Sequence, residues 1–121
     1  MKVEDILGNL LTVVNQLQVT HWNTHKHTEH QYTDQALDEI RPCVDEFVEV
    51  FQGKFAKRLT PSPTLTITVK QDFEIGDLIT KVKEIKSFLV RREDFDNDDL
   101  CDIVDNISKS LYVLNHHLSL D

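Results

Sequence analysis

The chain has 121 residues and a formal net charge of −8, with 40% hydrophobic and 28% charged residues. This length predicts a single domain covering residues 1–121, and the composition is typical of a globular protein. The acidic balance disfavours direct DNA binding, and no apolar stretch is long enough to span a membrane. Because the first residues do not resemble a signal peptide and the two cysteines fit a reducing compartment, we expect a cytoplasmic protein.

The first half of the chain carries the apolar spacing of two helices. Apolar residues recur at steps of three and four over residues 3–21, and His21 falls at the end of this stripe. The same period continues over residues 28–53, with Pro42 inside the run and Gly53 at its predicted end. Proline lacks the main-chain N–H that the helix requires, so we expect a kink in this second helix.

The second half predicts a long connection and two more helices. Residues 54–72 include the stretch LTPSPTLTITV, whose prolines and β-branched alternation indicate an extended crossover. Helical spacing returns over residues 73–92 and again over 97–119. A short loop, a long crossover and a second short loop are the pattern of an all-α, ferritin-like four-helix bundle with one long crossover between helices 2 and 3.

Histidines and carboxylates follow helical spacing around the first loop. If the first two helices form an antiparallel hairpin that turns near residue 25, His21 lies beside His30. Asp34 is one turn further along the same face as His30. Asp45 and Glu49 form another pair one turn apart, eleven residues beyond Asp34.

The spacing of these side chains predicts a site shared between two subunits. Eleven residues correspond to about 16 Å along a helix axis, and one metal ion cannot bridge that distance. An isologous two-fold contact places the His21, His30 and Asp34 end of one chain against the Asp45 and Glu49 end of another. Imidazole and carboxylate donors together suit iron, with manganese and zinc as alternatives.

Two simpler interpretations compete with a metal site. The acidic residues of the second helix also fit the solvated face of an amphipathic helix, and His25 and His27 fall in the predicted loop. Residues 94–105 resemble a calcium-binding loop in part, but Asp99 occupies the glycine position and Asp105 the position of the final glutamate. An acidic helix N-terminus explains that stretch better.

The histidine and carboxylate positions resemble those of the Dps family of mini-ferritins. The dipeptide His21-Trp22 is similar to the end of the family's first helix, and His30, Asp34, Asp45 and Glu49 have the offsets of its second helix. In that family, the histidines and the first aspartate come from one subunit and the remaining two carboxylates from its two-fold neighbour. The resemblance implies a ferroxidase centre of the same composition here.

The sequence therefore leaves two functions open. The first is a Dps-like iron-binding protein that oxidises Fe(II) at a site shared across a homodimer or within a larger homo-oligomer. The second is a non-catalytic helical dimer, or a structural protein, that retains the ferritin-like fold. Cys43 and Cys101 do not form a CxxC motif, and both are expected to be small core residues without a nucleophilic role.

Overall fold

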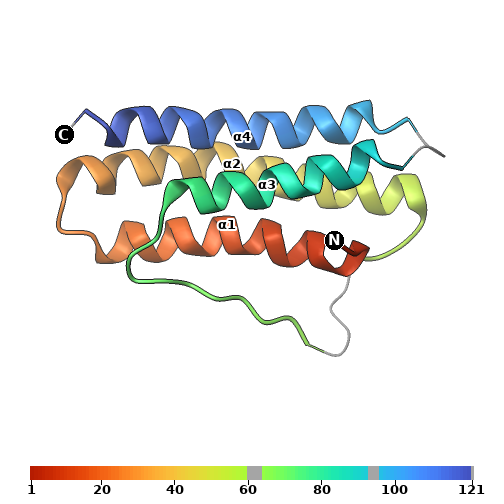
Figure 1. Cartoon of the computed structure of the whole chain (residues 1–121), viewed down its shortest axis with the longest axis horizontal. Coiled ribbons are helices and arrows are strands. Elements are labelled where there is room, and N and C mark those ends of the chain that lie inside the picture. Colours follow the sequence, from red (N-terminus) through yellow and green to blue (C-terminus); the bar gives the residue numbers. More distant parts are fainter. Residues whose placement is uncertain (60–63, 93–95, 121) are drawn as a thin grey trace.

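The chain folds into four α-helices (Figure 1). A computed structural model describes residues 1–59, 64–92 and 96–120. The helices are α1 (Val3–Asn23), α2 (His27–Phe55), α3 (Ile75–Val90) and α4 (Asp98–Leu118). All four predicted helices are present, each with ends within two residues of the predicted ones. The described part of the chain contains no β-strand, which confirms the all-α four-helix prediction.

Each helix packs against two neighbours. α2 contacts both α1 and α4, and α3 contacts α4 and, less extensively, α1. α1 and α2 run in opposite directions and are joined by the short turn 24–26 (Figure 1). α2 ends at one end of the bundle and α3 begins at the other (Figure 1). Because the turn between the antiparallel helices α1 and α2 is short, the C-terminus of α1 lies beside the N-terminus of α2.

The core consists of aliphatic and phenylalanine side chains from all four helices. Its largest fully buried members are Ile6, Leu10, Leu17, Leu37, Ile40, Phe47, Phe51, Ile85, Leu89, Leu100, Ile107 and Leu111. Burying one such side chain contributes about 1.5–3 kcal/mol to the free energy of unfolding. The spacing of Leu7, Leu10, Val14 and Leu17 predicts the buried stripe of α1, but the fully buried residues include Ile6 and Val13, and Leu7 and Val14 are only partly buried.

The end of α2 differs from the sequence prediction. The helix passes through Pro42, which is exposed, and continues beyond Gly53 to Phe55. Ala56 ends it in the left-handed conformation, with φ 51° and ψ 38°. Glycine adopts this conformation without strain, and alanine does so at a cost. The prediction that Gly53 ends the helix was therefore wrong by two residues, and a residue with a Cβ atom occupies the strained position.

An extended segment lies along α1 in the connection between α2 and α3 (Figure 1). Of the predicted crossover, residues 54 and 55 belong to α2 and residues 60–63 lie outside the described residues. The buried side chain of Gln16 holds the segment at Lys70. Its Nε2 donates to the Lys70 carbonyl oxygen at 2.9 Å, and its Oε1 accepts from the Lys70 N–H at 2.8 Å. Near the other end of the segment, a Cβ atom added to Gly8 would lie 3.4 Å from Leu65.

Candidate metal centre

His21 and His30 lie against each other at the α1–α2 turn. Their rings stack with centroids 4.0 Å apart and planes inclined by 16°. His21 is in the last turn of α1 and His30 is in the first turns of α2, so the short turn places them at one end of the bundle. The antiparallel hairpin therefore produces the juxtaposition that the sequence spacing predicts.

Reciprocal hydrogen bonds orient the two imidazoles. Nδ1 of His21 is 2.8 Å from the carbonyl oxygen of His30, and Nδ1 of His30 is 3.0 Å from the carbonyl oxygen of His21. A carbonyl oxygen can only accept, so Nδ1 carries the proton in both neutral rings. The lone pair is then on Nε2 of each ring. An Nδ1–H donated to a backbone carbonyl is a common way to orient a metal-binding histidine.

Asp34 lies close to this pair. Its Oδ1 is 4.0 Å from Nε2 of His21, with side-chain exposures of 61% for Asp34 and 15% for His21. The carboxylate is one turn of α2 beyond His30, as the spacing predicts. One exposed carboxylate and two Nε2 lone pairs therefore gather at the surface of one end of the bundle.

Thr33 contributes to this arrangement, and the sequence analysis did not identify it. Its hydroxyl is buried, donates to the Glu29 carbonyl oxygen at 2.6 Å, and lies 3.3 Å from Nδ1 of His21. The hydroxyl oxygen is a second acceptor for the His21 N–H, so Thr33 helps to fix that ring. A polar residue on the apolar stripe of α2, three and four residues before Ala36 and Leu37, was the available signal.

Asp45 and Glu49 do not join the histidine pair within one chain. Both carboxylates are exposed on α2, and neither forms a hydrogen bond or ion pair with another described residue. Across residues 1–59, 64–92 and 96–120, no group of three or more histidine, cysteine, aspartate or glutamate side chains is arranged to hold a metal ion. A single chain thus presents two separate sets of donors, one at the α1–α2 turn and one further along α2.

The remaining histidines and acidic residues have other surroundings. His25 and His27 are exposed at the α1–α2 turn, and the ring of His117 stacks on Tyr32 at 3.8 Å. Of the calcium-like stretch, Asp94 lies outside the described residues. Asp99 accepts from Lys54 Nζ at 2.9 Å, and Asp105 accepts from Lys86 Nζ at 2.8 Å. Two of these carboxylates therefore pair with lysines.

The two cysteines are not activated as nucleophiles. Burial raises the pKa of the Cys43 thiol, and the carboxylates of Glu46 and Glu39 raise it further. Burial also raises the pKa of the Cys101 thiol, against a lowering by Lys86, while Asp105 and its acidic neighbours add to the rise. Both side chains therefore favour the protonated thiol, which is a poor nucleophile.

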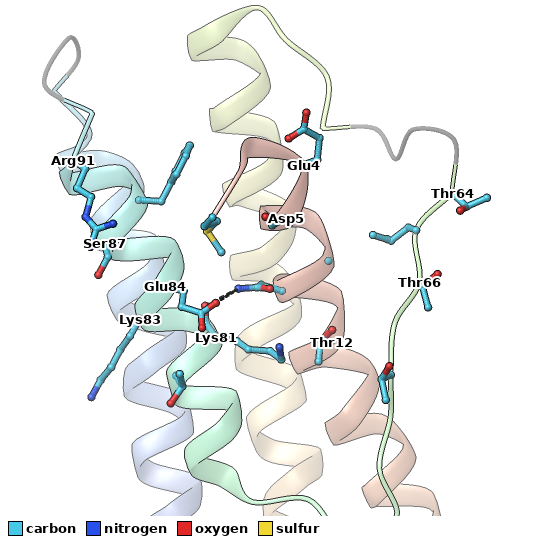
Figure 2. A pocket seen from close by; sticks show the side chains of 17 residues that line it. Glu4, Asp5, Thr12, Thr64, Thr66, Lys81, Lys83, Glu84, Ser87 and Arg91 are labelled. Carbon is cyan, nitrogen blue, oxygen red and sulfur yellow. Dashed lines mark hydrogen bonds between the residues drawn. The ribbon is translucent and has the colours of Figure 1, made fainter.

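A polar groove lies on another face of the bundle, between α1, α3 and residues 64–68 (Figure 2). Its volume is about 1070 Å³, and its lining mixes acidic side chains such as Glu4 with basic ones such as Arg91. On its floor, Nδ2 of Asn9 donates to the Lys81 carbonyl oxygen at 3.1 Å and to Glu84 at 3.3 Å. None of the described residues that line this groove is a histidine or a cysteine, so the groove is separate from the histidine pair.

The fold and the histidine pair define an all-α four-helix protein with oriented imidazoles at one end. No protein-family model matches the chain, no curated protein matches its sequence, and no solved structure matches its fold. None of the described helices is both long enough and apolar enough to cross a bilayer.

Proposed function

We propose that this chain is a Dps-like, ferritin-like protein that binds iron at a site shared across a two-fold homodimer and oxidises Fe(II) there. The observation that carries the proposal is the reciprocal hydrogen bonding of His21 and His30, which leaves both Nε2 lone pairs available beside Asp34. Metal-binding histidines commonly donate the N–H of the other ring nitrogen to a backbone carbonyl or a carboxylate. The orientation of the rings supports a ligand role.

The donor set fits the proposed substrate. Two neutral imidazoles and one carboxylate from one chain, with two carboxylates from another, form a mixed nitrogen and oxygen environment that suits Fe(II). Manganese and zinc are alternatives with similar ligand preferences. In the proposed reaction each Fe(II) gives up one electron to dioxygen or peroxide, which is reduced. The protein residues hold the metal ions and orient the imidazoles.

The distance along α2 supports a second copy as the partner that completes the site. Asp45 follows Asp34 by eleven residues, which is about 16 Å along the helix axis and too far for a common metal ion. Antiparallel placement of two α2 helices about a two-fold axis brings each histidine pair to the Asp45 and Glu49 pair of the other chain. The proposed assembly is a homodimer or a larger homo-oligomer built from it.

A non-catalytic helical dimer is the second candidate function. It is favoured by the exposure of Asp45 and Glu49 and by the finding that no described group of donors in one chain is arranged for a metal. In this alternative the carboxylates of α2 only form the solvated face of the helix, and the histidine pair only stabilises the turn.

Metal analysis and an Fe(II) oxidation assay distinguish these functions. Asp45→Ala/Glu49→Ala should lower bound iron and the oxidation rate by more than about tenfold, because the substitutions remove ligands. Glu46→Ala/Asp102→Ala, which removes two other exposed carboxylates, should retain both properties. Equal oxidation rates for the two double variants would support the non-catalytic alternative.

A further inference from the structure

Residues 64–70 form an extended segment that lies along α1 (Figures 1 and 2). Exposure alternates along it: every second side chain is exposed, and those between are partly buried. The exposed residues are Thr64, Thr66, Thr68 and Lys70, and the partly buried residues are Leu65, Ile67 and Val69. A period of two is the pattern of a β-strand with one face on an apolar surface.

The backbone of this segment is mostly unpaired. Lys70 is bonded through both its N–H and its carbonyl to Gln16, but residues 64–69 form no backbone hydrogen bond to any other described residue. In an extended chain, the N–H and carbonyl of one residue lie on the same edge and those of the next residue on the opposite edge. Leu65, Ile67 and Val69 therefore present these groups at the edge away from Gln16.

We propose that this segment pairs antiparallel with the same segment of a second copy of the chain, about a two-fold axis at Ile67. In this register Ile67 lies opposite Ile67 of the second copy, and Leu65 lies opposite Val69. All backbone groups at the edge away from Gln16 between residues 65 and 69 then find partners. On the exposed face, Thr66 lies opposite Thr68 of the second copy.

Charge and side-chain pattern favour a second copy as the occupant. The chain carries a net charge of −8, yet residues 64–70 contain no acidic residue and only Lys70 is charged. The paired segments themselves therefore set no carboxylate against another carboxylate. The alternation is also self-complementary, because threonine pairs with threonine on one face and aliphatic residues pair with each other on the other face. Natural proteins normally cover or pair such an uncharged strand edge.

This pairing is independent of the proposed metal site. None of the proposed ligands lies in residues 64–70, and Asp45→Ala/Glu49→Ala leaves the segment unchanged. The molecular mass of the protein in solution can therefore be measured with a chelator present. Bound metal then makes no contribution to the self-association that reports on strand pairing.

Charged substitutions at Thr66 and Thr68 test the pairing, with self-association measured by sedimentation equilibrium. Thr66→Lys/Thr68→Lys places lysine opposite lysine in both cross-strand pairs and should weaken self-association on the order of tenfold. Thr66→Asp/Thr68→Asp should do the same, and a mixture of the two variants should regain dimers. The matched control Thr66→Lys/Thr68→Asp places opposite charges together and should remain dimeric. If this control associates as weakly as the double lysine variant, or if the wild-type chain is monomeric at every concentration, the proposal is wrong.

Cysteine cross-linking tests the register without depending on stability. Under mild oxidation, a mixture of Thr66→Cys and Thr68→Cys chains should form disulfide-linked dimers more readily than either variant alone, because only the mixture sets cysteine opposite cysteine. Wild-type chains, which retain Cys43 and Cys101, give the background. Dimers by mass with no cross-link above that background would overturn strand pairing while leaving the proposed metal-sharing dimer in place.

Discussion

Nδ1 of His21 and Nδ1 of His30 each lie within 3.0 Å of the backbone carbonyl oxygen of the other residue, at 2.8 and 3.0 Å. This reciprocal pair links the end of α1 to the start of α2. The rings of the two residues also stack, and in the neutral form of each ring the contact selects the tautomer with the proton on Nδ1. One contact therefore joins the two helices at the turn and leaves the lone pair of each neutral ring on Nε2.

The stability of the α1–α2 turn should depend on this pair. His30→Ala removes the ring stack and one of the reciprocal hydrogen bonds, and should lower the free energy of unfolding by about 1–2 kcal/mol. His27→Ala, at an exposed position in the same turn, should change it by less than about 0.5 kcal/mol. Urea denaturation monitored by circular dichroism measures both. Equal effects of the two substitutions would contradict a structural role for the pair.

The end of α2 offers two stabilising substitutions. Ala56→Gly relieves the left-handed conformation at φ 51° and should raise the free energy of unfolding by about 1 kcal/mol. Gly53→Ala should add about 0.5–1 kcal/mol, because Gly53 is inside the helix.

A Cβ atom at Gly53 would meet nothing within 4 Å. The double variant has glycine at the end of the helix instead of in its interior. Thermal unfolding should show that the two substitutions each raise the melting temperature. A lower melting temperature for Ala56→Gly would show that Ala56 is not strained.

The ion pair between Lys54 and Asp99 should affect titration at acidic pH. The hydrogen bond from Lys54 is the main cause that lowers the pKa of the Asp99 carboxyl, and the Leu100 N–H also contributes. A carboxyl whose pKa is lowered by folding stabilises the fold above its unfolded pKa, and this stabilisation is lost as the pH falls through the folded pKa. The contribution is small because 56% of the Asp99 side chain is exposed.

NMR titration of the carboxyl carbons measures this effect directly. Lys54→Met should raise the pKa of Asp99 toward its ordinary value, whereas Lys86→Met, which removes the partner of Asp105, should leave it unchanged. If Lys54→Met does not move the Asp99 pKa, solvent screens the pair completely.

The helices could be predicted from the sequence because their apolar residues repeat with a clear helical period. The end of α2 could not be predicted, because glycine commonly ends helices, whereas here the helix continues two residues past Gly53 to Phe55, which packs against the core. The position of the extended segment depends on the hydrogen bonds of Gln16 to Lys70. A glutamine in an apolar stripe does not indicate which distant backbone it will bind.

The candidate site could be predicted in part. The neighbourhood of His21, His30 and Asp34 follows from the length of the turn and the helical period. The role of Thr33 and the choice of ring nitrogen depend on local backbone geometry, which residue spacing does not encode. Whether Asp45 and Glu49 complete the site depends on a second chain, and remains the proposal.

Complementation between two defective chains tests the shared metal site most directly. Asp34→Ala and Glu49→Ala chains, unfolded together and refolded as an equal mixture, form heterodimers in which one composite site has all its ligands and the other lacks two. Random pairing should restore about a quarter of the wild-type sites, measured as bound iron and as Fe(II) oxidation rate, while each variant alone stays near zero. A mixture no more active than the separate variants would contradict a site shared between subunits.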